Sequence, residues 1–130
     1  MKRLISILIL LIIIIGIAIV EELFIHNFIT NLTTKAEVVS VEIENSKENL
    51  KNENITKTYT DLKDFWKKSK IGLCYFTNYE KIKTVDESFV KLSTALKNND
   101  LSLATENIAV IKEYGDFFHY MMGFNLNNLF

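Results

Sequence analysis

The sequence contains no proline and only four glycines among its 130 residues. Sheets and irregular domains use these residues in their turns, whereas long helices joined by short polar links need few of them. Their scarcity therefore favours an all-α protein. About 20 residues form an apolar N-terminal run, and the remaining length of about 110 suits one small domain and is too short for two.

The chain also lacks a second cysteine and an excess of either charge. Cys74 stands alone, so no disulfide can form within the chain, and we interpret it as a small apolar filler without redox chemistry. Fifteen basic and 16 acidic residues give a net charge of −1. This balance argues against nucleic acid as a partner, because the protein has no excess of positive charge to neutralise the phosphates.

Patterns that carry catalysis or hold cofactors are missing as well. The sequence has no glycine-rich phosphate loop and no histidine close to Cys74 on the same helix. A metal site built on its two histidines, His26 and His119, would need two further ligands. Acidic side chains that stand close together fall in polar runs and are expected to be solvated, namely Asp61, Asp64, Asp86 and Glu87. We expect neither an enzyme nor a bound cofactor.

What the sequence does have is an uncharged apolar run from Leu4 to Val20, preceded by Lys2-Arg3 and followed by Glu21-Glu22. As a helix it covers about 25 Å, close to the hydrocarbon core of about 30 Å, and the two basic side chains can lengthen it by snorkelling. We interpret residues 1–22 as a transmembrane anchor in the cell membrane. Since basic residues stay in the cytoplasm, residues 23–130 are expected to form an extracytoplasmic domain.

A cleaved signal peptide is the alternative for this run. Gly16 and Ala18 supply small residues at the spacing of a cleavage site. The run is longer than the roughly 7–15 apolar residues of a signal peptide, however, and no polar segment precedes Ala18. Retention of the anchor is therefore favoured.

Beyond the anchor, apolar residues recur at alternating intervals of four and three, the period of a buried helical face. This period predicts four helical seams, at Ile25–Leu50, Ile55–Phe76, Ile82–Leu96 and Ala104–Met122. The first is continuous with the anchor, so one helix should leave the membrane and enter the domain. Short links force neighbouring helices to pack antiparallel, which predicts an up-down four-helix bundle, with a three-helix array as the alternative.

The links between seams carry residues suited to helix caps. The first break is predicted in the polar stretch Asn45–Asn54 and is centred near Lys51–Glu53, with Asn52 or Asn54 as the cap of the next helix. Asn78 suits the second break, and Asp100 suits the third because its carboxylate can accept bonds from exposed amides of the next turn.

Several segments together resemble a known family. They are the N-terminal anchor, Asp64-Phe65-Trp66-Lys67-Lys68, Tyr79-Glu80-Lys81-Ile82, Asp86-Glu87-Ser88, Asn99 to Ala104 and Leu126 to Phe130. The chain is similar over nearly its whole length to the domain-of-unknown-function 4363 family of small membrane-anchored helical proteins from spore-forming Gram-positive bacteria. The resemblance implies an anchored extracytoplasmic helical domain and no assigned activity. Family members usually have His-Glu where this chain has Tyr79-Glu80, so no role of that histidine transfers.

Aromatic and methionine side chains gather at one end of the predicted bundle. We call the end beside the anchor the near pole, and its candidate interface residues are Phe24, Phe28, Tyr75, Phe76, Tyr79, Phe117, Phe118, Tyr120, Met121, Met122 and Phe124. Such residues suit the headgroup zone or contact with another membrane protein. The alternative, which the helical spacing of many of these aromatic residues favours, is that they close the end of the bundle core.

Two hypotheses of function follow from this pattern. The first is a non-enzymatic, single-pass accessory protein that binds an integral-membrane partner through the near pole. The alternative is a homo-oligomeric structural protein in which the seam from Ile25 to Leu50 pairs between chains as a coiled coil.

Overall fold

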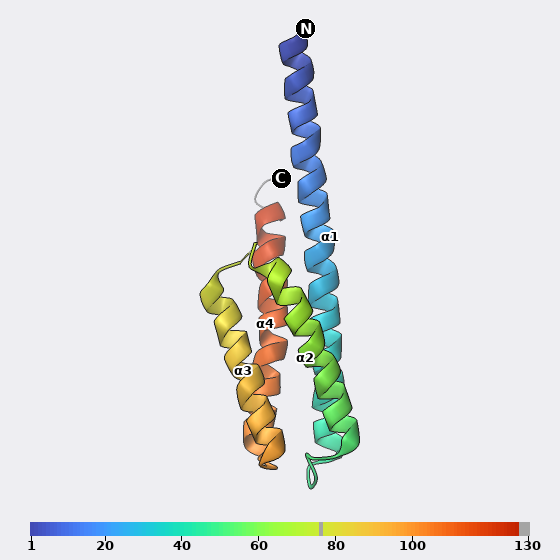
Figure 1. Cartoon of the computed structure of the whole chain (residues 1–130), viewed down its shortest axis with the longest axis vertical. Helices are drawn as coiled ribbons and strands as arrows, with labels where there is room; N and C mark the ends of the chain where they lie inside the picture. Colours follow the sequence, from blue (N-terminus) through green and yellow to red (C-terminus); the bar gives the residue numbers. More distant parts are fainter. Residues whose placement is uncertain (76, 128–130) are drawn as a thin grey trace.

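The computed structural model describes the backbone of residues 1–75 and 77–127 and the side chains of residues 1–75 and 77–118. Within this part the chain forms four helices and no strand: α1 (Lys2–Asn45), α2 (Glu53–Leu73), α3 (Tyr79–Lys97) and α4 (Leu101–Asn127). Figure 1 shows that successive helices run in opposite directions, with the first and third links at the end far from the N-terminus. The predicted all-α up-down bundle is confirmed.

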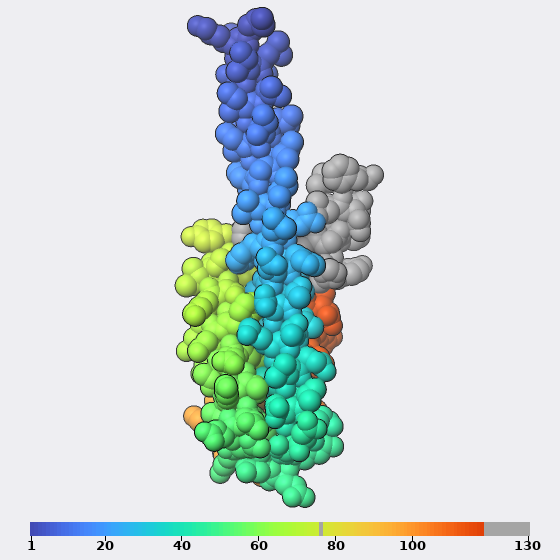
Figure 2. Space-filling view, turned by 90° about the vertical axis from the view of Figure 1, so that its right-hand side faces the viewer, coloured from blue at the N-terminus to red at the C-terminus, as the bar shows by residue number. Residues whose placement is uncertain are grey.

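The first helix joins the apolar run to the bundle without a break. It has 44 residues, and its N-terminal part projects beyond the other three helices (Figure 2). Every side chain from Leu4 to Val20 is exposed. Among the described residues, α1 alone is long and apolar enough to cross a membrane. The predicted continuity of the apolar run and the bundle is thus confirmed, whereas the role of the run as an anchor and the domain boundary after residue 22 stay predictions.

The helices form an open rather than an evenly closed bundle. Helix α1 packs against α2 and α4, and α4 packs against α3, while the backbones of α2 and α3 meet only sparsely. Large side chains bridge this wider space. The Trp66 ring stacks on the Phe89 ring with centroids 5.9 Å apart, and the Tyr59 hydroxyl donates to the Phe89 carbonyl at 3.1 Å. Aromatic side chains therefore hold α2 and α3 together.

The predicted seams supply the core. Their buried apolar members are Ile25, Ile29, Leu32, Ala36, Val39, Ile43, Leu50, Ile55, Tyr59, Leu62, Trp66, Leu73, Ile82, Val85, Phe89, Leu92, Leu96, Ala104, Ile108, Ile111 and Phe118. Burial of these side chains is the main stabilising contribution to the fold, because each valine, leucine, isoleucine or phenylalanine contributes about 1.5–3 kcal/mol when it is fully removed from water. Phe76 and the side chain of Met122 lie outside the described residues.

The first break lies within the predicted stretch Asn45–Asn54 but begins before its expected centre. Helix α1 ends at Asn45, before the expected Lys51–Glu53, and the chain then makes tight turns in which Asn49 N–H donates to the Ser46 carbonyl at 3.0 Å. The run of polar residues ends the helix early because these side chains compete for backbone hydrogen bonds. Asn52 is the cap of α2, as predicted, since its side-chain oxygen accepts from Asn54 N–H at 2.7 Å.

The other two predicted caps are confirmed. The Asn78 side-chain oxygen accepts from Glu80 N–H at 3.0 Å at the start of α3. The Asp100 carboxylate accepts from Leu103 N–H at 3.1 Å at the start of α4. Each cap satisfies an amide that would otherwise lack a partner in the first helical turn, a contribution of about 1 kcal/mol.

Candidate functional site

The near pole brings together three helix ends beside α1. The end of α2, the start of α3 and the last turns of α4 lie next to the stretch of α1 that follows the apolar run (Figure 1). The far pole holds the links after α1 and after α3, which are almost wholly polar. The up-down topology predicted from short links therefore separates an aromatic pole from a polar one.

Four predicted interface residues at the near pole have exposed side chains. Tyr75 and Tyr79 flank the link between α2 and α3 and are 83% and 72% exposed. Phe24 on α1 is 37% exposed, and Phe117 on α4 is 38% exposed. Partly exposed aromatic side chains with an apolar body are common at binding surfaces and at membrane interfaces. All four side chains are therefore at least partly open to solvent at this pole.

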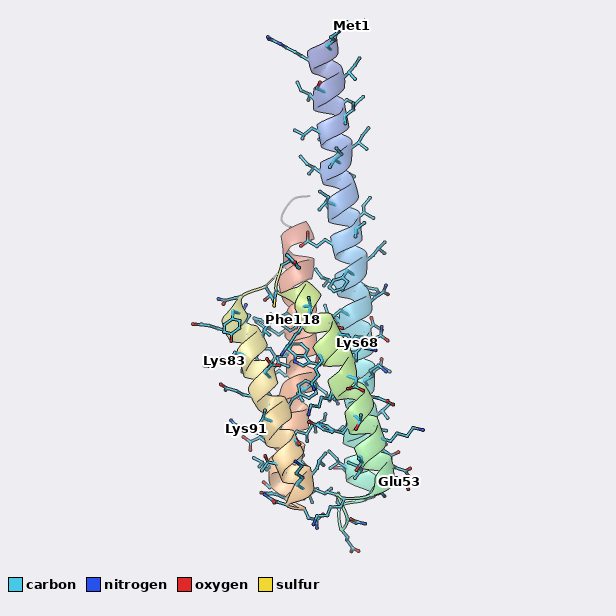
Figure 3. All side chains as sticks on the ribbon, viewed as in Figure 1. Met1, Glu53, Lys68, Lys83, Lys91 and Phe118 are labelled. Atoms are coloured by element: carbon cyan, nitrogen blue, oxygen red, sulfur yellow. The ribbon has the colours of Figure 1, made fainter. Side chains whose placement is uncertain are left out.

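Two other predicted interface residues belong to the core. Phe28 and Phe118 are each 3% exposed, and their rings meet edge to face with centroids 6.1 Å apart. Figure 3 shows Phe118 lying among the helices below the near pole. Phe28 also lies against Phe65 and Trp66, at centroid distances of 5.8 and 6.2 Å. The rings of Phe28 and Phe118 therefore close the end of the core, which was the alternative to an interface role, and they do not form part of the surface.

The remaining predicted residues fall where the structure gives no side-chain description. These are Phe76, Tyr120, Met121, Met122 and Phe124, of which the last four lie on the helical backbone of α4.

Sequence reasoning missed one apolar residue of the near pole. Ile71 on α2 is an exposed large hydrophobic residue, as is Leu23 on α1, which the sequence had already placed at this pole. Ile71 lies outside the period of its seam, and a large apolar residue at such a position was the available signal. Nearby, a Cβ added to Gly72 would lie 2.7 Å from the Phe24 ring. The lack of a side chain at Gly72 therefore lets α2 approach this aromatic ring closely.

A shallow pocket of about 320 Å³ lies between α3 and α4 at the near pole. It is lined by Lys81, Glu113, Tyr114 and Phe117. The Lys81 ammonium lies 4.6 Å from the centroid of the Phe117 ring, a cation–π contact. Of these four residues, the sequence had singled out only Phe117, because a pocket between two helices depends on which faces meet.

A polar cluster links α2 to α3 below this pole. The indole N–H of the buried Trp66 donates to Asp86 Oδ1 at 2.7 Å, and Lys70 Nζ approaches both oxygens of that carboxylate at 3.3 and 3.1 Å. Asp86 is therefore partly buried and accepts hydrogen bonds from Trp66 and Lys70. The prediction that it lies on a solvated face is wrong. Asp61, Asp64 and Glu87 are exposed, as predicted. Asp86 has a packing role, since it satisfies the buried indole.

Two further predictions concern chemistry. Cys74 is exposed just beyond α2, so its assignment as a core filler is wrong. The cysteine follows Leu73, the last buried residue of the helix, and the chain turns outward there. Within the described side chains, no three histidine, cysteine or acidic residues are grouped closely enough to hold a metal ion. His26 is exposed, and the side chain of His119 lies outside that part.

A second groove, of about 330 Å³, opens between α2 and α3 toward the far pole. Its lining residues are Leu50, Lys51, Thr56, Tyr59, Thr60, Ser93, Leu96 and Lys97. Burial raises the pKa of the Tyr59 hydroxyl above its usual value of 10.0, and a hydrogen bond with Ser93 opposes part of this rise. The hydroxyl is therefore neutral near pH 7 and acts as a structural donor to α3.

Comparison with protein families covers nearly all of the bundle. Residues 23–129 match the model of the family described as "Domain of unknown function (DUF4363)". The chain belongs to this family. The DUF4363 match begins at Leu23, directly after Glu21-Glu22, and includes both poles. Comparison with curated proteins and with solved structures gives no match. The resemblance seen in the sequence is confirmed, and the family description names no activity.

Proposed function

We propose that this DUF4363 protein is a non-enzymatic, single-pass accessory protein that binds an integral-membrane partner through its near pole. Residues 1–22 anchor it in the cell membrane, and the bundle lies on the extracytoplasmic side. The main observation in support of this proposal is that exposed apolar side chains lie at the pole beside the apolar run, whereas the opposite pole is polar. An unbroken helix sets the distance of that pole from the bilayer.

The near pole has the composition of a contact surface. Its exposed apolar residues are Leu23, Phe24, Ile71, Tyr75, Tyr79 and Phe117. Neighbouring exposed side chains of this size on several elements mark interaction sites more often than isolated ones do. Because the anchor is continuous with α1, a partner in the same membrane would meet this surface without a search through solution.

Co-purification from gently solubilised membranes tests this proposal. We expect tagged wild-type protein to retain an integral-membrane protein, and the double variant Tyr75→Ser/Tyr79→Ser to retain it about tenfold less, the effect of losing an aromatic anchor. Val90→Ser is the control, since Val90 is also an exposed apolar residue, at 67%, but lies in the middle of α3. Equal retention by the wild type and the double variant would contradict binding at the near pole.

Pairing of two chains through the seam from Ile25 to Leu50 is the competing hypothesis. In the structure Leu32, Ala36 and Val39 are fully buried within the bundle. A coiled coil between chains would have to replace these intramolecular contacts, and the packing therefore favours the accessory role. In a Cys74→Ser background, a disulfide cross-link between chains at Ala36→Cys would support pairing, and its absence alongside a folded bundle would oppose it.

A further inference from the structure

The pocket between α3 and α4 combines opposite charges with an aromatic wall. Lys81 and Glu113 both line it, together with Tyr114 and Phe117. The rings of Tyr114 and Phe117 meet edge to face with centroids 6.2 Å apart. Tyr114 also lies 6.2 Å from the buried Phe118, so the aromatic wall is fixed to the core of the bundle.

The two charges are not satisfied by each other. No ion pair joins Lys81 or Glu113 to any residue whose side chain is described, although neighbouring Lys112 forms one with Glu37. Lys81 instead lies over the Phe117 ring. The pocket thus presents an ammonium donor on α3 and a carboxylate acceptor on α4, neither of which is ion-paired with a described side chain.

We propose that this pocket binds a small zwitterion carrying an ammonium and a phosphate group, the chemistry of phosphoethanolamine. Lys81 receives the phosphate, because an ammonium to phosphate contact is a charge-assisted hydrogen bond. Glu113 receives the ligand ammonium, and the neighbouring Tyr114 ring favours a cation at its face, while Lys81 already lies over the Phe117 ring. An anion without an ammonium group leaves Glu113 unpaired and is disfavoured.

The place of the pocket suits a phospholipid headgroup as the source of this zwitterion, a source that depends on the anchoring proposed above. The core ring next to the pocket, Phe118, meets Phe28, which lies about 12 Å along α1 from Val20. A headgroup layer extends about 5–8 Å beyond the hydrocarbon core. A helix tilt of about 20°, common in membranes, lowers the pocket toward that layer when α1 leans to this side.

Lipid retention by the purified full-length protein tests the proposal. The protein is placed in mixed micelles with equal amounts of phosphatidylethanolamine and phosphatidylglycerol, and bound lipids are counted by native mass spectrometry. We expect wild type to retain phosphatidylethanolamine in preference. Lys81→Gln should weaken binding of both lipids by about tenfold, and Glu113→Gln should remove the preference, effects of losing one hydrogen bond to a charged group. Lys83→Gln and Glu106→Gln change exposed charges on the same helices and should behave as wild type.

The results distinguish two questions: whether the pocket binds a zwitterion, and whether that zwitterion is a lipid headgroup or a soluble molecule. If calorimetry detects binding of soluble phosphoethanolamine and Lys81→Gln abolishes it, the pocket binds a free zwitterion. If only phosphatidylethanolamine is retained, the pocket binds the zwitterion as a lipid headgroup. Equal retention of both lipids by wild type together with no binding of phosphoethanolamine overturns the proposal, as do equal losses in the control variants. Because the Tyr75 and Tyr79 variants leave this pocket intact, failure of partner binding and failure of zwitterion binding are distinguishable.

Discussion

The side-chain amide of Asn99 is bonded to the backbone beside Leu50, 49 residues earlier in the chain. Its oxygen accepts from Leu50 N–H at 2.7 Å, and its nitrogen donates to the Glu48 carbonyl at 3.2 Å. Asn99 itself has a positive φ of 55°, a conformation that asparagine tolerates better than most residues. One residue thus ties the two links of the far pole together and holds Leu50, which lies outside any helix, within the core.

This bridge predicts a graded loss of stability. Asn99→Ala should lower the free energy of unfolding by about 2–3 kcal/mol, because two hydrogen bonds and a tolerated left-handed residue are lost. Asn99→Gly should lose only about 1–2 kcal/mol, since glycine adopts a positive φ without strain. Thermal unfolding of the full chain in detergent micelles, followed by circular dichroism, measures both.

Asn98→Ala is the matched control, because Asn98 has a negative φ of −92° in the same link. If it destabilised the protein as much as Asn99→Ala, the effect would belong to the link as a whole and not to the bridge.

Helical period and cap residues were enough to predict most of this fold. The seams were read from intervals of four and three, and the caps at Asn52, Asn78 and Asp100 follow from side chains that compete for amides. The bridge from Asn99 could not be predicted in this way, because it depends on two links that meet only after the bundle has formed. The early end of α1 was not predicted, because Leu50 fits the helical period although it lies in a turn.

The candidate site was predicted less well than the fold. Aromatic residues near helix ends indicated the near pole. The period placed the buried Phe118 in the seam of α4 and the exposed Phe117 outside it, about 100° away around the helix, but the predicted interface included both. The roles of Lys81 and Glu113 depend on the contact between α3 and α4. A charged side chain on an amphipathic helix gives no sequence signal for such a contact.

The close approach of α1 and α4 at Thr33 and Gly115 leads to a second prediction. A Cβ added to Gly115 would lie 2.7 Å from Thr33 Oγ1, and this buried oxygen has no hydrogen-bond partner in the described part of the chain. Gly115→Ala alone gains about 1 kcal/mol of helix propensity and loses about 1–3 kcal/mol to overpacking, so we expect no stabilisation. In a Thr33→Ala background, the same substitution should stabilise the protein by up to about 1 kcal/mol.

A double-mutant cycle on thermal unfolding measures this coupling. Gly16→Ala offers a comparison, because nothing lies within 4 Å of an added Cβ there. Additive effects of the Thr33 and Gly115 changes would show that the two helices relax apart without cost.

The buried Tyr59 hydroxyl predicts a loss of stability in alkali. Its pKa is raised by burial in the folded state, so the unfolded chain gives up this proton first as the pH rises past about 10. The unfolded state then binds fewer protons than the folded state, and the free energy of unfolding falls with pH. The contribution of Tyr59 is complete below pH 10 and is lost as the pH approaches the higher folded-state value.

Comparison of wild type with Tyr59→Phe between pH 8 and pH 11 isolates this effect. At pH 8 the variant should be less stable by about 1 kcal/mol, because the bond to the Phe89 carbonyl is lost. The difference should shrink or reverse at pH 11. Tyr75→Phe removes a hydroxyl at an exposed position and controls for the substitution itself. A constant difference across this range would contradict the assignment.

The exposed thiol of Cys74 allows the proposed membrane topology to be tested on the natural sequence. Because Cys74 lies at the near pole and is already accessible, a membrane-impermeant maleimide should label it in intact cells without denaturation. Positive residues at positions 2 and 3 favour a cytoplasmic N-terminus, which leaves this thiol outside. Labelling is detected by gel shift after affinity purification, and the intact mass of the same sample shows whether residues 1–22 are retained.

Two variants make the topology result decisive. Cys74→Ser should abolish labelling, and Asn98→Cys in that background should restore it, since Asn98 is exposed at the far pole of the same bundle. Both poles lie on one side of the apolar run, so their thiols should label together. Labelling of either thiol only after the cells are permeabilised would place the bundle in the cytoplasm and exclude the proposed extracytoplasmic partner surface.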